Sequence, residues 1–394
     1  MKIAFFSDEP LITSGGSYSF TNILKEEIES SNTTYEYCFL FIDKSHPKYI
    51  IKNNIKYINI YKDNNISLFN KFINKINLFF NINKKRINKF NYIDKIIKDE
   101  NIDLLCVIGT YKIVTTFPFI YIIWDIAHRV LPCFPEVTKN NEWESRENTL
   151  NYMLYHATYI VTGNESGKKE IINNYNINPE KIHIIPFPVS SIYINNNETL
   201  NKLNNIVEPF IFYPAQFWPH KNHITLIESI AYIRDNKDII INCYFTGKDF
   251  GNLLFITEQI KKYNLQNQVF IMGFIEQSTL IYLYKNALAM TYVSLLGPNN
   301  LPPLEAIAMG CPLIYSNIPG HMEQMEGTGI SVNPLNSNEI GEAIYNLYIN
   351  QDFRKRLINS ELKLSKKYLD YSYLKQLELL FNDFKQYLKT WKNI

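Results

Sequence analysis

The segment between positions 294 and 312 combines a strand end, a loop and a short helix in a way that could hold a phosphate. The sequence predicts a helix over Leu301–Met309, with Asn300 at the N-cap, prolines in the first turn, and Gly310 at its end. Backbone N–H groups and the helix dipole favour an anion at such a terminus. Glu305 lies one turn into the helix, where it could reach ribose hydroxyls beside the phosphate. The alternative is that Glu305 stabilises only its own helix.

A second segment supplies a cation at an equivalent position. Lys221 follows a predicted strand, Phe210–Tyr213, and precedes a predicted helix, Ile224–Arg234. Ligands of α/β folds bind at the carboxyl ends of the strands, so we expect Lys221 at the same sheet edge as the phosphate. There its ammonium would neutralise a diphosphate as a point charge. The alternative is an ordinary exposed lysine.

Two weaker signals lie in the first half of the chain. Gly15 and Gly16 follow the first predicted strand and open a helix, so the backbone there could approach a ligand closely. The fingerprint GxGxxG is absent, so a nicotinamide cofactor is not supported. Asp125 and His128 follow another predicted strand. One His near one Asp is more often a satisfied turn than a catalytic pair, and a metal site would need a third ligand that the sequence does not nominate.

The elements that must position these residues alternate between continuous apolar runs, typical of buried parallel strands, and amphipathic segments of helical length. The predicted strands are Lys2–Phe6, Tyr35–Ile42, Ile102–Ile108, Phe119–Trp124, Tyr159–Thr162, Ile182–Ile185, Phe210–Tyr213, Ile239–Phe245, Val269–Met272, Leu288–Val293 and Pro312–Tyr315. The predicted helices are Ser17–Glu29, Glu142–His156, Glu165–Tyr175, Ile224–Arg234, Leu253–Tyr263, Leu301–Met309 and Glu339–Tyr348. This βαβ rhythm predicts an α/β fold with two Rossmann-like domains facing across a cleft.

An Asn-rich stretch without periodicity, 195–208, separates the two sets of elements and is interpreted as a linker. We therefore expect an N-terminal domain over residues 1–195 and a C-terminal domain over 196–370. Apolar residues spaced three and four apart from Leu374 to Trp391 predict a long amphipathic helix within 371–394, packing back towards the N-terminal domain. Dimerisation through this helix is the less favoured alternative, because the stripe covers fewer than three heptads.

Composition limits the classes of function. The 394 residues carry 40 Lys and Arg against 38 Asp and Glu, a net charge of +2, which excludes a globally basic nucleic-acid binder. Five scattered cysteines without a CxxC pair argue against a disulfide framework or a zinc ribbon and favour a reducing cytoplasm. Neither a signal-peptide core nor a membrane-spanning run is expected. The acid-free stretch 66–93 is basic and aromatic and could contact an anionic membrane, the alternative being a Lys-rich surface helix.

Taken together, these motifs resemble the family 4 glycosyltransferases, retaining nucleotide-sugar transferases of the two-domain GT-B fold. The resemblance spans nearly the whole chain and is most specific from Phe210 to Pro334. One matching element is the family's pattern of two Glu separated by seven residues, which corresponds to Gly297–Glu305, with Ser294 ahead of it. The others are the pair Gly273-Phe274, the stretch 318–323, the glycine loop at Gly15-Gly16, and the His-Asp region at 124–128.

Two positions depart from the family pattern. The first Glu of the pair is Gly297 here, so its role is not carried over. The family has an Arg five residues before its phosphate-binding lysine, and this position is Gln216 here. Lys221 would therefore hold the diphosphate with less positive charge beside it. Some sugar transferases of the family carry a similar Gly-Pro-Asn-Leu-Pro-Pro-Leu-Glu pattern, which suggests variation within the family. We expect Gly297→Glu to be tolerated or even helpful.

The resemblance implies a metal-independent hexosyltransferase without a cofactor. It would move a hexose from a nucleoside diphosphate sugar, bound by the C-terminal domain, to a saccharide or lipid-linked acceptor on the N-terminal side, in surface polysaccharide or glycoconjugate synthesis. The implied catalytic residues are Lys221, Glu305, His128 and Asp125, and the implied donor-binding residues are Gly15, Gly16, Gln216, Gly273, Phe274, Ser294, Asn299, Asn300 and Leu301. Two alternatives stay open: an inactive nucleotide-sugar-binding partner protein, suggested by Gly297 and Gln216, and an epimerase of the same fold, which would need paired carboxylates in the cleft.

Overall fold

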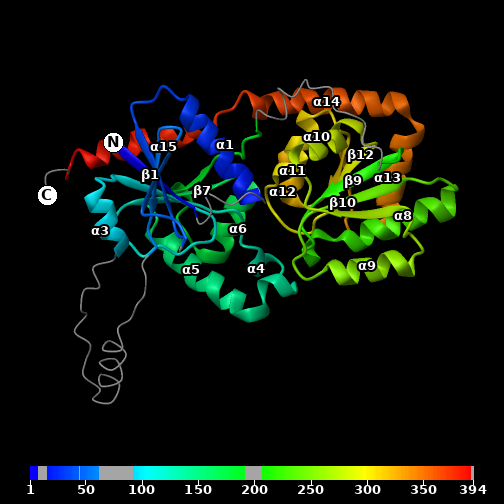
Figure 1. Cartoon of the computed structure of the whole chain (residues 1–394), viewed down its shortest axis with the longest axis horizontal. Helices are drawn as coiled ribbons and strands as arrows, with labels where there is room; N and C mark the ends of the chain where they lie inside the picture. The colour runs from blue at the N-terminus through cyan, green and yellow to red at the C-terminus, as the bar shows by residue number, and fades with distance from the viewer. Residues whose placement is uncertain (8–15, 44, 62–91, 191–205, 392–394) are drawn as a thin grey trace, which may run out of the picture. The chain divides into compact units, whose positions relative to one another are not determined.

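The structure is a computed structural model that describes residues 1–7, 16–43, 45–61, 92–190 and 206–391 (Figure 1). The described residues group into two compact units. The first unit combines Met1–Ile123, Thr149–Ile160 and Asn382–Ile394, and the second combines Trp124–Asn148 and Val161–Phe381. Most of the predicted linker lies outside the described residues, and the predicted domain boundaries stay a prediction.

The described residues form two β-sheets. The first has eight strands in the order β3-β4-β2-β1-β5-β6-β7-β8. Their bounds are β1 (Lys2–Phe6), β2 (Glu36–Phe41), β3 (Tyr49–Lys52), β4 (Ile55–Asn59), β5 (Leu104–Ile108), β6 (Phe119–Ile122), β7 (Tyr159–Thr162) and β8 (Ile182–Ile184). Strand β1 pairs in parallel with β2 and β5, and all five residues of β5 are buried. Burial on both faces explains why these strands are continuous apolar runs in the sequence.

The second sheet has six strands in the order β11-β10-β9-β12-β13-β14, and within the described chain all of its pairings are parallel. Their bounds are β9 (Phe210–Pro214), β10 (Asn242–Thr246), β11 (Val269–Gly273), β12 (Ala289–Tyr292), β13 (Leu313–Ser316) and β14 (Ile330–Val332). From β9 the chain proceeds to β10 and β11 on one side, and from β12 to β13 and β14 on the other. The order therefore reverses between the adjacent strands β9 and β12, which is where ligands of such sheets bind.

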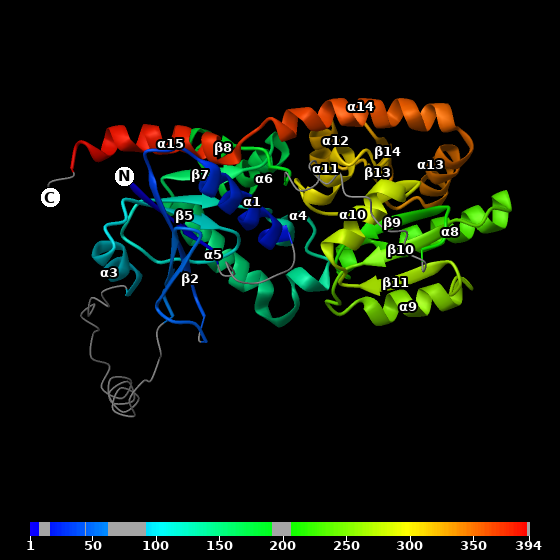
Figure 2. The same ribbon diagram turned by 45° about the horizontal axis from the view of Figure 1, so that its top comes forward.

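The α-helices connect these strands. Their bounds are α1 (Gly16–Ser30), α3 (Tyr92–Asp99), α4 (Ala127–Val130), α5 (Glu142–His156), α6 (Glu165–Tyr175), α8 (His223–Lys237), α9 (Leu253–Lys262), α10 (Gln277–Asn286), α11 (Leu301–Ala308), α12 (Pro319–Met325), α13 (Ser337–Ile349), α14 (Gln351–Leu369) and α15 (Tyr373–Leu388). In the second unit α9 lies on one side of the sheet and α14 on the other (Figures 1 and 2). Helix α8 packs on α13, and α11 packs on α14. No helix in the described part of the chain is long and apolar enough to cross a membrane.

The α/β class is confirmed, with two sheets that are parallel apart from the antiparallel pair β3–β4. Most predicted elements agree with the structure to within a few residues. The predicted strand Ile239–Phe245 starts too early, since β10 begins at Asn242. Asp238 is left-handed with φ 53° and Ile240 is 65% exposed, so the chain joins the sheet only after both. The predicted membrane-contacting stretch 66–93 lies outside the described residues, apart from the first two residues of α3.

The amphipathic helix predicted near the C-terminus is present as α15. Its apolar stripe is buried at Leu374, Leu377, Phe381, Phe384 and Leu388, while Trp391 lies beyond the helix and is 38% exposed. Within the first unit, the second half of α15 accepts hydrogen bonds from two tyrosines. The hydroxyl of Tyr35 donates to Oδ1 of Asn382 at 2.6 Å, and the hydroxyl of Tyr159 donates to the carboxylate of Asp383.

Candidate functional site

A cavity of about 690 Å³ in the second unit brings several of the predicted residues together. Asp125, Lys221, Asn299 and Asn300 line it, and so does Gly297. This volume lies within the range of small-molecule sites, roughly 300–1,000 Å³. The cavity is therefore large enough for a sugar or a nucleotide.

Lys221 reaches this cavity because β9 and β12 are neighbours. Lys221 ends a short 3-10 helix, Pro219–Lys221, after β9, and Tyr292 is the last residue of β12. The ammonium of Lys221 donates to the hydroxyl of Tyr292 at 2.9 Å and lies 3.5 Å from Oγ of Ser294. Its backbone is held as well, since the hydroxyl of Tyr213 donates to the carbonyl of Lys221 at 2.7 Å. The cation is thus positioned at the point where the strand order reverses.

Asn300 lies at the start of α11 and shares the hydroxyl of Tyr292 with Lys221. Oδ1 of Asn300 accepts from this hydroxyl at 2.6 Å, and Nδ2 donates to the carbonyl of Gly297 at 3.1 Å. Nδ2 is also 2.8 Å from Nε2 of His321. Burial, and then the charge of Lys221, lowers the pKa of His321 to about 3, so His321 is neutral and its Nε2 can accept from Asn300.

The predicted role of the α11 terminus as a source of several free amides needs correction. Asn300 occupies the N-cap position, but its side chain makes no capping hydrogen bond because it is used by Tyr292, Gly297 and His321. The backbone N–H of Asn300 donates to Oε1 of Gln324 at 3.2 Å. Positions 302 and 303 are proline and have no N–H. Of the first three helical residues only Leu301 carries an amide, so the helix dipole and Lys221 carry more of the predicted anion binding.

The loop before α11 fits tightly against its surroundings. Gly297 has φ +108°, and a Cβ there would lie 2.9 Å from Nδ2 of Asn300. A Cβ at Gly320 would meet the backbone of Pro298 at 2.5 Å. Asn164, the N-cap of α6, donates from Nδ2 to the carbonyl of Pro298 at 2.6 Å. A side chain at position 297 is therefore strained by the positive φ and displaces the side chain of Asn300, which argues against the expectation that Gly297→Glu would be tolerated.

Charged groups of both signs line the cavity. Oδ1 of Asp125 accepts from the backbone N–H of Ala127 at 2.9 Å and from Arg146 at 3.3 Å. Nε of Arg146 donates to Glu142 at 2.8 Å. Arg146 is therefore shared between two carboxylates, which reduces its ability to attract a further anion. Lys221 has no such carboxylate partner within the described residues, so it is the better site for a diphosphate.

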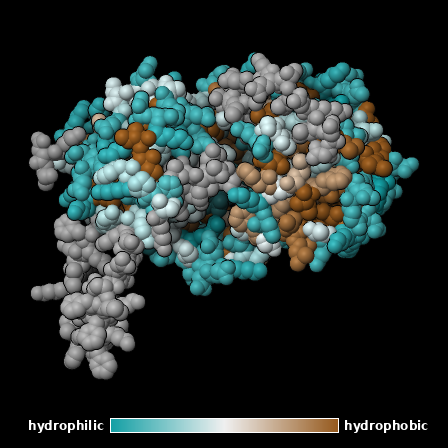
Figure 3. Space-filling model, viewed as in Figure 1, coloured by the Kyte–Doolittle hydropathy of each residue, from teal (hydrophilic) through white to brown (hydrophobic). Residues whose placement is uncertain are grey.

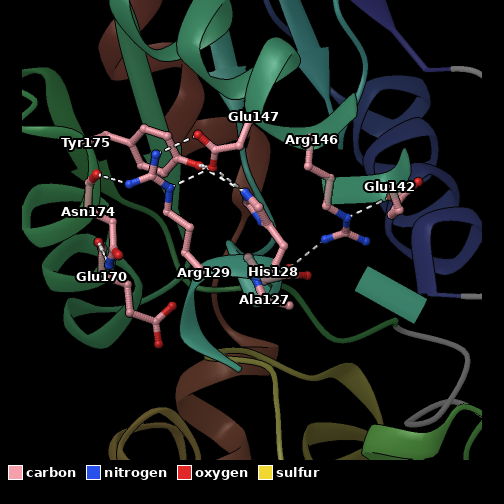
Figure 4. A network of polar contacts seen from close by, with 10 residues as sticks. Ala127, His128, Arg129, Glu142, Arg146, Glu147, Glu170, Asn174 and Tyr175 are labelled. Atoms are coloured by element: carbon pink, nitrogen blue, oxygen red, sulfur yellow. Dashed lines mark hydrogen bonds and ion pairs between the residues drawn. The ribbon is translucent and has the colours of Figure 1, made fainter. Parts of the chain in front are cut away.

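His128 does not line the cavity and belongs to a polar network with Glu147, Arg129 and Tyr175 (Figure 4). Its ring is fully buried, and Nε2 is 2.7 Å from Oε1 of Glu147. Glu147 also accepts from Arg129 at 2.6 Å and from the hydroxyl of Tyr175 at 2.8 Å. The hydrogen bonds from Arg129 lower the pKa of Glu147 to about 2, although burial opposes the shift. The structure thus separates Asp125, which lines the cavity, from His128, which does not. The catalytic role of His128 stays a prediction.

Several other residues that were predicted to bind or act on the nucleotide sugar do not line the cavity. Glu305 is buried and accepts from the hydroxyl of Tyr284 at 2.8 Å. Gln216 accepts from Nε1 of Trp218 at 3.0 Å. Besides His128, the predicted residues of the second unit that do not line the cavity are Glu305, Gln216, Ser294, Leu301, Gly273 and Phe274. Gly16 begins α1 in the first unit, and Gly15 lies outside the described residues.

Several lining residues were not predicted from the sequence. They are aromatic or charged, and include Trp124, Glu136, Arg146, Trp218, His220 and Phe250. Trp218 and Phe250 stack at 4.3 Å with an interplanar angle of 18°, and Phe250 is 41% exposed. Apolar side chains also gather on the surface of the second unit (Figure 3). The aromatic residues beside Lys221 gave a signal, but a chain with 28 Tyr and 25 Phe offers too many aromatic residues for it to be selective.

The chain has the fold of solved GT-B structures, which include glycosyltransferases. The chain is similar to sucrose-phosphate synthase from Thermosynechococcus elongatus, with a TM-score of 0.70 and 16% identity over 98% of this chain and 99% of that one. It is similar to a glycosyltransferase from Rickettsia africae, with a TM-score of 0.67 and 19% identity over 100% of this chain and 99% of that one. Anabaena HepE in complex with UDP-glucose gives a TM-score of 0.69 and 14% identity over 98% of this chain and 100% of that one. The GT-B class is thereby confirmed.

The second half of the chain matches a protein-family model. Residues 196–363 match the family described as glycosyl transferases group 1, which confirms the resemblance noted from the motifs over that part of the chain. Curated relatives include the O-antigen chain mannosyltransferase RfbU of Salmonella typhimurium, 26% identical over 198 residues, which are 50% of this chain and 53% of that protein. The O-antigen chain mannosyltransferase B of Escherichia coli is 23% identical over 219 residues, 53% of this chain and 56% of that protein. The matched region thus spans about half the length of these relatives.

Proposed function

We propose that this chain is a retaining glycosyltransferase that moves a hexose from a nucleoside diphosphate sugar to a hydroxyl of a saccharide or lipid-linked acceptor. The process it would serve is the synthesis of a surface polysaccharide or glycoconjugate, at the cytoplasmic side of a membrane. The observation that carries the proposal is the contact of Lys221 and Asn300 with one hydroxyl, that of Tyr292, beside the cavity at the reversal point of the sheet.

The names of the relatives and neighbours support this choice of substrate class. Two of the curated relatives are O-antigen mannosyltransferases. Among the structural neighbours, HepE is known in complexes with UDP and with UDP-glucose, and the E. coli trehalose-6-phosphate protein with UDP-2-fluoro glucose. Nucleoside diphosphate hexoses are therefore the first donors to test, with GDP-mannose and UDP-glucose at the head of the set.

In the proposed reaction, the bond between C1 of the hexose and the diphosphate oxygen breaks while the acceptor oxygen bonds to C1 on the same face. The acceptor proton passes to the departing phosphate oxygen, so no separate base is needed. Negative charge grows on the diphosphate, where Lys221 and the dipole of α11 would stabilise it. Removing one such group commonly costs about 3–4 kcal/mol of transition-state stabilisation. Glu305 would hydrogen-bond to ribose hydroxyls of the donor. Because its carboxylate accepts from the hydroxyl of Tyr284 in this structure, a rearrangement would first have to break that contact.

An inactive nucleotide-sugar-binding protein is the second candidate. Gln216, which stands where the family has Arg, accepts from Trp218 and does not line the cavity, so it adds nothing to the charge there. Binding without turnover would follow if Lys221 alone could not stabilise the negative charge on the departing diphosphate. This candidate differs from the transferase in turnover, not in affinity.

The test is release of nucleoside diphosphate by the purified chain. GDP-mannose, UDP-glucose and UDP-galactose are each incubated with a mixture of saccharide and polyprenyl-linked acceptors, with and without EDTA. We expect release from at least one donor, a product with the donor's anomeric configuration, and no loss of rate with EDTA. Binding of a donor without release would favour the inactive protein, and conversion of a donor to its epimer without acceptor would favour an epimerase. Loss of activity in EDTA would contradict metal independence alone.

A further inference from the structure

Glu136 places a buried carboxylate beside the cavity with one oxygen unused. It lies in a short 3-10 helix, Pro135–Val137, and its side chain is only 6% exposed. Oε1 accepts two hydrogen bonds from His220, one from the backbone N–H at 3.0 Å and one from Nδ1 at 2.6 Å. Oε2 is buried and has no hydrogen-bond partner among the described residues. Glu136 and His220 both line the cavity, and His220 directly precedes Lys221.

An unpartnered carboxylate oxygen is costly unless a ligand satisfies it. Burial alone would raise the pKa of Glu136, but the hydrogen bonds from His220 outweigh burial and leave the pKa below its ordinary value. Glu136 is therefore ionised at neutral pH, and Oε2 carries part of a negative charge. Buried polar groups in native structures nearly always have partners, and the exceptions mark sites of strain or function. Because Oε1 is held by His220, Oε2 is the oxygen left without a partner.

Asn299 supplies the complementary group. Its Nδ2 is also buried without a hydrogen-bond partner among the described residues, and Asn299 lines the same cavity. Two residues that line the cavity thus each hold a buried polar atom without a partner, the acceptor Oε2 of Glu136 and the donor Nδ2 of Asn299, and a turn of either side chain would bring that atom to a ligand. A cation would satisfy only Glu136, and an anion would satisfy only Asn299. Hydroxyl groups both donate and accept, so a ring with several hydroxyls satisfies the two atoms together.

We propose that Glu136 and Asn299 bind hydroxyl groups of a sugar ring, and that Glu136 is a specificity residue for the carbohydrate. The proposal rests on the proposed function for its source of sugar, which is either the hexose of the donor or the acceptor saccharide. Gly297, where the family pattern has a Glu, lines the same cavity, so Glu136 brings in a carboxylate from another part of the chain. A hydroxyl bound to an ionised carboxylate is worth about a ten- to hundredfold change in affinity.

The test compares the wild-type chain with Glu136→Gln, Asn299→Asp and the control Glu144→Gln. Glutamine keeps an acceptor for His220 but replaces Oε2 by an NH₂ group. Aspartate at 299 replaces the NH₂ group by an oxygen. Glu144 is exposed on α5 and does not line the cavity. Trp124 and Trp218 line the cavity, so their fluorescence reports binding of UDP, GDP, UDP-glucose, UDP-galactose and GDP-mannose. Circular dichroism and thermal unfolding check that each variant is folded.

If the bound ring is the donor hexose, Glu136→Gln weakens binding of the preferred sugar nucleotide at least tenfold and leaves binding of its nucleoside diphosphate unchanged. If the ring belongs to the acceptor, both affinities stay unchanged and KM for the acceptor rises at least tenfold. Equal losses for nucleotide and sugar nucleotide, or no change in any of these quantities, would overturn the proposal. If the wild-type chain binds no nucleotide, the proposed function fails by itself. Binding of free oligosaccharides then tests the sugar site separately. Weaker binding by Glu136→Gln than by the wild type supports the site, and equal binding overturns it.

Discussion

Lys221 and Asn300 contact the same hydroxyl group, that of Tyr292. The ammonium donates to this hydroxyl at 2.9 Å, and the hydroxyl donates to Oδ1 of Asn300 at 2.6 Å. The hydroxyl therefore accepts a hydrogen bond from the cation and donates one to Asn300 at the start of α11. One rigid aromatic residue at the end of β12 thus fixes a positive charge relative to a helix terminus, and both features favour an anion.

Removing the cation should abolish most of the turnover. We expect Lys221→Ala to lower kcat for hexose transfer by about two to three orders of magnitude, because the departing diphosphate loses its main positive partner. Lys262→Ala serves as the control, since Lys262 is an exposed lysine in the last turn of α9. Initial rates of nucleoside diphosphate release measure the effect. A Lys221→Ala enzyme with a wild-type rate and a wild-type melting temperature would mean that the diphosphate binds elsewhere.

Tyr292→Phe isolates the role of the shared hydroxyl. The phenyl ring is kept under the ammonium, whose Nζ lies 5.2 Å from the ring centroid, but the link to Asn300 is lost. We expect a loss of stability of about 1 kcal/mol and a fall in kcat that is smaller than that of Lys221→Ala. Urea unfolding gives the first quantity and steady-state kinetics the second. A rate equal to that of Lys221→Ala would show that Lys221 acts only when Tyr292 holds it.

Much of the fold was predictable because local pattern and tertiary burial agree. The five residues of β5 are all apolar in sequence and all buried, and α6 has a clear N-cap in Asn164. The β3–β4 hairpin was missed, although Asn53 and Asn54 with φ of 49° and 61° form its turn, because Asn is too common in this chain to stand out. Helix α14 was missed for a similar reason, since it is polar and Lys-rich and its N-cap is another Asn, Asn350.

The site was only partly predictable for a different reason. Lys221 and Asn300 could be paired because each follows a parallel strand, and adjacent strands end at one edge. Glu136 follows no strand and reaches the cavity through a short 3-10 helix, so its spacing in the sequence carries no signal. The burial of Glu305 against Tyr284 was equally unpredictable, because a Glu in an early helical turn is compatible with either an exposed or a buried side chain.

Gly297→Ala should destabilise the second unit more than a matched glycine substitution. Both Gly297 and Gly251 have positive φ, +108° and +96°, so an alanine at either site costs about 1–2 kcal/mol of backbone strain. A Cβ at position 297 also meets the side-chain amide of Asn300 at 2.9 Å, whereas no atom lies within 4 Å of one at Gly251. The difference in the free energy of unfolding between the two variants therefore measures the clash with Asn300. Equal values would show that the loop before α11 relaxes freely.

Glu361 should make the stability of the second unit depend on pH between about 4.5 and 8. Its side chain is buried between α14 and β13, Oε1 accepts from the backbone N–H of Leu313 at 3.0 Å, and Oε2 has no partner among the described residues. Burial raises the pKa of Glu361 from 4.5 to about 8 in the folded chain. The folded state then holds a proton that the unfolded state releases, so stability is fully present below pH 4.5 and falls as the pH rises to about 8. The slope is at most about 1.4 kcal/mol per pH unit.

The measurement is urea unfolding at pH 5, 7 and 8 for the wild-type chain and Glu361→Gln. Burial also raises the pKa of Glu170, to about 7, so Glu170 adds a slope of the same sign below pH 7, and the interval from 7 to 8 is the more selective for Glu361. Glu361→Gln cannot lose a proton and should show a smaller fall in stability over that interval than the wild type. Glu180→Gln is the control, because Glu180 is exposed. Identical slopes for the wild type and Glu361→Gln would mean that Glu361 ionises normally, through water reaching it between α14 and β13.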